Sequence, residues 1–254
     1  MAVAADPTSD DALLGGKLVL RQPVAGHRFG HDAVLLAAAT PARRGEEAIE
    51  LGAGVGAAGL ALARRVEGLA VTLVEIEPSL AALSRENAAR NELAARVRAV
   101  CLDVRAKPAQ FAAAGLSENC ADHVLMNPPF NAPNQSSPDR ARRLARDASS
   151  DTLAQWIDTA ARLLRPQGAL TLVWRADGLA AVLAALTQLG AIAITPVYPK
   201  PAAAAIRVLI SATKNSRAPL TLLPGLVLAD SDNKPTAAAE AILRDGAALD
   251  QKAR

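Results

Sequence analysis

Short apolar runs alternate with longer amphipathic segments along most of this chain. We expect the apolar runs to be strands, at 48–51, 71–76, 97–102, 124–126, 169–174, 191–198 and 206–213. Apolar residues at helical spacing predict helices at 33–39, 57–66, 78–91, 153–164 and 178–189. Because strands that alternate with helices form crossover units, the pattern predicts an α/β fold whose mostly parallel sheet is covered on both faces.

The residues Asn127-Pro128-Pro129-Phe130, which follow the strand at 124–126, form the first candidate site. Proline has no backbone N–H and holds φ at about −65°, so the strand must end at Asn127. The turn then holds a polar amide and an aromatic ring at the carboxyl end of a strand, where α/β proteins bind their ligands. A turn with a purely structural purpose is the alternative.

A glycine-rich segment, Glu50-Leu51-Gly52-Ala53-Gly54-Val55-Gly56, lies between the first of these strands and a helix. Glycine lets the backbone approach a ligand closely, and a helix N-terminus favours a negative group. The segment also fits the dinucleotide-binding pattern, and a tight turn is its structural alternative. Glu75 and Asp103 end the next two strands, so they suit contacts to a ribose and an adenine, although Asp103 alone fits a strand-end cap equally well.

Composition narrows the possible functions. The chain has 254 residues, 51% of them hydrophobic, which is enough for one large core. A net charge of +3 permits an acidic partner without requiring one. Only 2% of residues are aromatic, which excludes a single-strand binder built on rows of stacking rings. The two cysteines, Cys101 and Cys120, fit no metal spacing, so we expect no metal and interpret them as buried, reduced thiols.

No apolar run reaches the roughly 18 to 20 residues of a membrane span, and the acidic N-terminus does not resemble a signal peptide, so we expect a cytoplasmic protein without membrane contact. We predict a disordered tail at 1–12 and a single domain at 13–254. Within that domain we expect an N-terminal extension at 13–45, a Rossmann-like core at 46–215 and a C-terminal extension at 216–254.

The motifs together resemble a known family. The glycine segment, Glu75, Asp103 and the Asn-Pro-Pro-Phe turn are similar to those of class I S-adenosylmethionine-dependent methyltransferases that modify amino groups. The whole chain, over 13–245, resembles the bacterial tRNA(Val) adenine-N6 methyltransferases. Arg28-Phe29-Gly30-x-Asp32 resembles their N-terminal signature, and 220–243 resembles their C-terminal segment. Phe130 departs from their usual tyrosine and also occurs in rRNA guanine-N2 and adenine-N6 enzymes, which leaves the target base open.

The resemblance implies a doubly wound, seven-stranded sheet, S-adenosylmethionine as cofactor, and an RNA substrate, with adenine N6 in tRNA as the leading target. Its implied cofactor-binding residues are Glu50, Gly52, Gly54, Gly56, Glu75, Asp103 and Asn127. Its implied catalytic residues are Asn127, Pro128, Pro129 and Phe130, with the ring of Phe130 stacked on the base and two carbonyls holding its amine.

Several arginines follow the turn, and we interpret them either as RNA phosphate contacts or as a solvated charged face. They are Arg140, Arg142, Arg143 and Arg146. Alternative functions remain: rRNA guanine-N2 or protein-glutamine methylation, or a module that binds cofactor or RNA without catalysis. An NAD-dependent oxidoreductase would explain the glycines but leave Asn127 without a role. The sequence does not indicate an oligomeric state.

Overall fold

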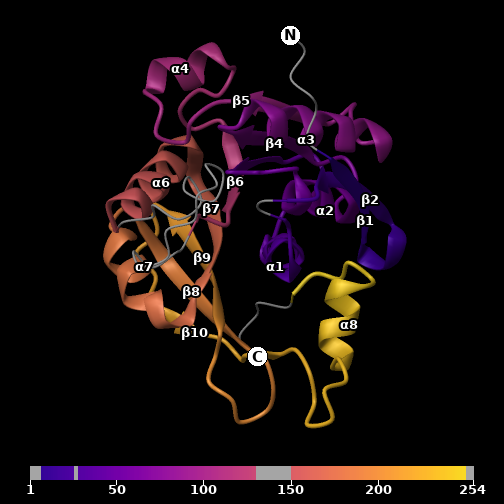
Figure 1. Ribbon diagram of the computed structural model, residues 1–254. Helices are drawn as coiled ribbons and strands as arrows, with labels where there is room; N and C mark the ends of the chain where they lie inside the picture. Colours follow the sequence, from indigo (N-terminus) through magenta and orange to yellow (C-terminus); the bar gives the residue numbers. More distant parts are fainter. Residues whose placement is uncertain (1–6, 26–27, 130–149, 250–254) are drawn as a thin grey trace.

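A computed structural model of the chain describes residues 7–25, 28–129 and 150–249. Figure 1 shows a central twisted sheet with helices on both sides, and the predicted α/β architecture is confirmed. The main sheet has the strand order β10-β8-β9-β7-β6-β3-β4-β5, with β11 also paired to β8.

Seven long strands make up most of this sheet, as predicted. They are β3 (Glu47–Leu51), β4 (Ala70–Glu75), β5 (Val97–Cys101), β6 (Ala121–Met126), β7 (Leu164–Arg175), β8 (Leu189–Tyr198) and β9 (Arg207–Lys214). β9 runs antiparallel to both of its neighbours, whereas the other pairings are parallel. The two-residue strands β10 (Thr221–Leu222) and β11 (Leu226–Val227) extend the sheet beyond β8.

Each face of the sheet carries its own group of helices and its own apolar core (Figure 1). One face is covered by α1 (His31–Ala39), α2 (Ala57–Arg65) and α3 (Pro78–Arg90). The other is covered by α4 (Pro108–Ala113), α6 (Ser150–Leu163) and α7 (Leu179–Ala185), the last entered through the 3-10 turn η2 (Ala176–Gly178). Leu73 and Val74, neighbours in β4, belong to different cores because successive strand residues point to opposite faces.

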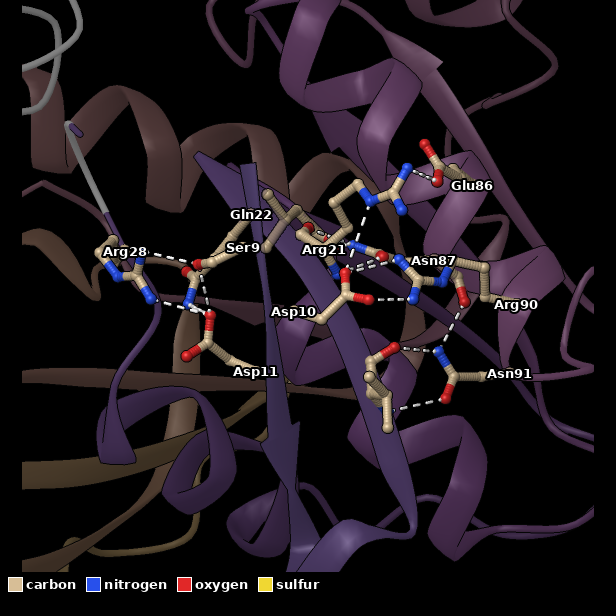
Figure 2. Close-up of polar contacts among 12 residues, drawn as sticks. Ser9, Asp10, Asp11, Arg21, Gln22, Arg28, Glu86, Asn87, Arg90 and Asn91 are labelled. Atoms are coloured by element: carbon tan, nitrogen blue, oxygen red, sulfur yellow. Dashed lines mark hydrogen bonds and ion pairs between the residues drawn. The ribbon is translucent and has the colours of Figure 1, made fainter. Parts of the chain in front are cut away.

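An N-terminal hairpin, β1 (Thr8–Leu13) and β2 (Leu18–Pro23), packs against α3 and is joined by the 3-10 turn η1 (Leu14–Gly16). The predicted disordered tail is therefore wrong for residues 8–12. Figure 2 shows the reason: Asp10 accepts hydrogen bonds of 2.8 and 2.6 Å from Arg90 of α3. These bonds, followed by weaker contributions from Arg21, lower the pKa of Asp10 to about 2.

The C-terminal segment returns to the start of the chain. Its helix α8 (Ala237–Leu243) begins where Thr236 accepts a hydrogen bond from the Ala239 N–H at 3.1 Å. Farther on, the Leu249 N–H donates to the carbonyl of Ala38 in α1 at 2.9 Å. The C-terminal segment is therefore hydrogen-bonded to α1.

Both cysteines are free thiols, but the expectation that they are buried is wrong. Cys101 is exposed because it ends β5, which lies at the edge of the sheet, and Cys120 is only half-buried.

Candidate active site

The predicted site residues gather at the carboxyl edge of the sheet. Leu51 of β3 pairs with Met126 of β6, and Glu75 of β4 pairs with Cys101 of β5. The residues that follow these strand ends therefore share one edge. They are Gly52–Gly56, Ile76, Asp103 and Asn127.

The glycine loop is a turn that L-residues adopt only with strain. The φ angles are +68° at Gly52, +56° at Gly54 and +88° at Gly56. The Ala53 N–H donates to the Val74 carbonyl at 2.9 Å, which fixes the loop to the end of β4. α2 begins directly after Gly56, so the loop leads into the first turn of that helix.

Trp156 of α6 lies against this loop, a contact that the sequence analysis did not identify. A Cβ added to Gly52 would lie 2.4 Å from Cη2 of the indole, so only glycine fits beneath the ring. One turn later, the Thr159 hydroxyl donates to the Val104 carbonyl at 2.9 Å and ties α6 to the loop after β5. The helical spacing of apolar residues over 153–164 predicts that one face of this helix is buried. It does not predict that this face contacts the glycine loop.

The carboxylate of Glu75 holds the glycine loop through a hydrogen bond. Its Oε2 accepts from the Gly54 N–H at 2.7 Å and its Oε1 accepts from the Glu77 N–H at 2.9 Å. Each carboxylate oxygen can accept a further hydrogen bond, so two acceptor positions remain for the hydroxyls of a ligand. Glu75 thus has two structural partners, and its predicted contact with a ribose stays a prediction.

Glu50 points away from this edge toward α2. Its Oε2 accepts from the Gly59 N–H at 2.7 Å, and the residue is 5% exposed. Burial, with a smaller contribution from the charge of Glu75, raises the pKa of Glu50 to about 8 although the Gly59 bond opposes the shift. Glu50 therefore holds α2 against β3, and its predicted cofactor contact stays a prediction.

Asp103 and Ile76 follow the ends of β5 and β4 at the same edge of the sheet. Asp103 accepts from the backbone N–H of Arg105 at 2.8 Å and pairs with its guanidinium at 3.1 Å. Burial acts to raise the pKa of Asp103, but these bonds from Arg105 outweigh it and the net pKa is lowered. Ile76, which the sequence analysis also missed, is apolar yet 39% exposed at the strand end, as a residue that packs on a flat ligand would be.

Asn127 ends β6 beside the loop and carries the most unusual polar atom of this edge. Its side-chain oxygen Oδ1 is buried and has no hydrogen-bond partner among the described residues. Most buried polar atoms are paired, so an unpaired acceptor at this strand end is unusual. Pro128 behind it is buried and Pro129 is half-buried, which limits the freedom of the turn.

The remaining predicted residues, Phe130, Arg140, Arg142, Arg143 and Arg146, lie outside the described residues. Over the described ranges, no group of three or more His, Cys, Asp or Glu side chains could hold a metal ion. None of the helices in that part of the chain is long and apolar enough to cross a membrane.

Comparison with known proteins gives several relatives that share one name. A tRNA1(Val) (adenine(37)-N6)-methyltransferase of Tolumonas auensis is 30% identical over 147 residues, and the match spans 58% of each chain. One of the same name from Actinobacillus succinogenes is 29% identical over 213 residues, 82% of this chain and 85% of the relative. The chain thus spans less than two thirds of the Tolumonas relative's length.

Among solved structures, a predicted O-methyltransferase of Agrobacterium tumefaciens is similar with a TM-score of 0.74 and 30% identity, covering 86% of this chain and 98% of that one. The Thermus thermophilus 16S rRNA N2 G1207 methyltransferase, at 20% identity and a TM-score of 0.53, covers 84% of this chain and 46% of that one and shares the fold. The family model of the methyltransferase small domain matches residues 27–188. Because this match covers more than half of the chain, the chain belongs to the methyltransferase small domain family.

Proposed function

We propose that the chain transfers a methyl group from S-adenosylmethionine to the exocyclic amine of a base in RNA, with adenine N6 in tRNA as its target. The observation that carries this proposal is the buried, unpaired Oδ1 of Asn127 at the strand end beside the glycine loop. Such an oxygen accepts a hydrogen bond from an amine without first losing a partner within the protein.

The chemistry of an exocyclic amine explains why an acceptor is needed. The nitrogen lone pair is delocalised into the ring, so the amine is a weak nucleophile. When Asn127 Oδ1 and the backbone carbonyl of Pro128 accept its two hydrogens, the nitrogen is held with its lone pair toward the methyl group. Neither carbonyl acts as a base, and their contribution is alignment and polarisation. As the N–CH3 bond forms, the S–CH3 bond would break with S-adenosylhomocysteine as the leaving group, and the methylated nitrogen would release one proton to solvent. The ring of Phe130 would stack on the base after it leaves its neighbours.

The residues at the carboxyl edge fit S-adenosylmethionine, which supplies an electrophilic methyl group on its sulfonium. Within the glycine loop, Gly54 gives an approach free of described side chains, and the two remaining acceptor positions of Glu75 suit the ribose hydroxyls. Ile76 would pack on the adenine ring, with Asp103 at its edge. These assignments require no movement of the loop, because Glu75 and Val74 already hold it.

The choice of adenine in tRNA follows the relatives, several of which are tRNA1(Val) (adenine(37)-N6)-methyltransferases. Two other acceptors have support of their own. The Thermus structure is of an rRNA guanine-N2 enzyme, and the Agrobacterium protein is described as a predicted O-methyltransferase. An amine acceptor agrees better with Asn127, because a hydroxyl must lose its proton and a neutral amide oxygen is not a base.

The test is to identify the methylated atom directly. The full chain is incubated with methyl-labelled S-adenosylmethionine and separate pools of unmodified tRNA, rRNA and protein, and each labelled pool is digested and analysed. The Asn127→Ala variant is the matched control for background transfer. Label on N6-methyladenosine from tRNA supports the proposal, whereas label on N2-methylguanosine, glutamine or an oxygen atom identifies one of the alternatives and contradicts it.

A further inference from the structure

Asn87 of α3 and Asn91, which caps the C-terminus of α3, bind the edge of β2 that faces away from β1, as a neighbouring strand would (Figure 2). Asn87 Oδ1 accepts from the Arg21 N–H at 2.7 Å, and Asn87 Nδ2 donates to the Arg21 carbonyl at 2.9 Å. One helical turn later, Asn91 makes the same two bonds to Val19, at 3.0 and 2.9 Å. The two amides therefore replace two steps of a strand ladder and seat the hairpin on α3.

Asn87 differs from Asn91 in one partner. Its Nδ2 also donates to the carbonyl of Val55, in the glycine loop, at 3.1 Å. The second donation of Asn91 goes instead to the carbonyl of Asn87 at 2.8 Å, within α3. Both side chains are buried, at 0% and 7% exposure, and each makes three hydrogen bonds. They are a natural matched pair.

The hydrogen bond between Asn87 and the Val55 carbonyl acts at the centre of the glycine loop. Val55 lies between Gly54, whose N–H binds Glu75, and Gly56, whose positive φ leads into α2. Glycines have the greatest backbone freedom, so the peptide group between Val55 and Gly56 depends on its hydrogen bonds to hold one orientation. Its N–H, that of Gly56, donates to the Ala53 carbonyl at 2.8 Å within the loop, and its carbonyl takes a partner from outside the loop. The amide of Asn87 is such a partner.

The hairpin also holds the segment that precedes α1. Gln22 of β2 accepts from the Phe29 N–H at 3.1 Å and donates to Asp11 of β1 at 2.9 Å. Arg28 donates to the same Asp11 carboxylate at 2.8 Å (Figure 2). The hairpin is thus bonded on one side to the entry of α1 and on the other, through Asn87, to the glycine loop.

We infer that Asn87 is a positioning residue that couples the seated hairpin to the cofactor loop, so that affinity for S-adenosylmethionine depends on this side chain. The inference rests on the proposed function, since it takes the loop at 52–56 as part of the cofactor site. Asn87 acts through Val55 and does not touch the cofactor itself.

The test compares Asn87→Ala with Asn91→Ala in the full chain. Affinities for S-adenosylmethionine and S-adenosylhomocysteine are measured by titration calorimetry, together with melting temperature and hydrogen exchange. Both variants lose three buried hydrogen bonds and should melt at similarly lower temperatures. Only Asn87→Ala should weaken binding, by about three- to ten-fold, the equivalent of one hydrogen bond, and only it should speed exchange across 52–58.

Equal losses of affinity in the two variants, or unchanged affinity in Asn87→Ala, would overturn the inference. Should Asn87→Ala not fold, Asn87→Ser, which keeps a short polar side chain, takes its place with the same expectation. Glu75→Ala separates this inference from the proposed site. If Glu75→Ala binds as well as the wild type, the proposed site is wrong, whereas if it loses affinity while Asn87→Ala retains it, only the coupling is wrong.

Discussion

Replacement of Asn127 by alanine should remove activity without lowering stability. Asn127 Oδ1 is buried and has no partner within the part of the chain that the structure describes. Leaving a buried acceptor unpaired costs about 1 to 3 kcal/mol, and truncation to alanine relieves that cost. The small cavity left at this half-buried residue offsets part of the gain. We therefore expect the free energy of unfolding to stay equal or rise by about 1 kcal/mol, and the melting temperature to rise by no more than about 2 to 4 °C.

The same substitution should strongly reduce methyl transfer. Loss of one preorganised hydrogen-bonding group at a reacting centre typically lowers kcat by about 10² to 10³. Affinity for S-adenosylmethionine should change little, because the loop and Glu75 are held by other groups. The assay is steady-state transfer of labelled methyl to unmodified tRNA, with cofactor affinity and thermal melting measured on the same preparation.

Asn87→Ala is the control within the same molecule, since that asparagine is buried with all its partners present and its loss should lower the melting temperature. A fall of similar size in Asn127→Ala would show that Oδ1 has a native partner, and the reasoning would fail. Activity within ten-fold of the wild type would equally remove Asn127 from the mechanism. Asn127→Asp retains an acceptor oxygen at the same position and should keep more activity than alanine does.

Three further predictions concern Glu75, the glycine loop and Glu50. Glu75→Ala should weaken S-adenosylmethionine binding by about 1.5 to 3 kcal/mol in calorimetry, and unchanged affinity would place the ribose elsewhere. Gly52→Ala should be less stable than Gly54→Ala by about 1 to 3 kcal/mol in denaturant unfolding, because both have positive φ but only Gly52 meets Trp156, at 2.4 Å; equal losses would refute the contact. Because the pKa of Glu50 is raised from 4.5 to about 8, its contribution to stability is complete below the lower value and is lost as pH rises through the higher one. Melting temperatures of Glu50→Gln should therefore fall less than those of the wild type from about pH 5 to about pH 8, and parallel curves would contradict this.

Much of the fold was predictable because its determinants are local. Apolar runs that end in Glu75 and Asn127, with amphipathic segments between them, are sufficient for a parallel sheet with helices on both faces. The ends of these strands then place the glycine loop, Glu75 and Asn127 on one edge of the sheet, and the strand register confirms this placement. The direction of the Glu50 side chain was also predictable, because successive strand residues point to opposite faces. Glu50 therefore lies on the face opposite Leu51, toward α2.

The first strand of the N-terminal hairpin, β1, could not be predicted in the same way. The residues Thr8-Ser9-Asp10-Asp11 are polar and give no signal of burial, so they resemble a flexible tail. They are ordered by Arg90, which binds Asp10, and by pairing with β2, which Asn87 and Asn91 hold in turn. The partners in these three side-chain contacts lie more than sixty residues apart in the sequence. A local pattern does not contain such pairings, and the contact of Trp156 with Gly52 was missed for the same reason.

The two halves of the site differ in how fully their polar groups are satisfied. On the cofactor side, the loop is held by Val74, Glu75 and Asn87, so its shape is set before any ligand binds. On the substrate side, Asn127 Oδ1 is left unpaired at a cost to the folded state. In the proposed reaction, the rigid loop would fix where the methyl group is offered, and an acceptor without a competing partner among the described residues would give the incoming amine a single favourable position beside it. Because both features meet at neighbouring strand ends, the register of β3 and β6 would supply the alignment that the proposed transfer requires.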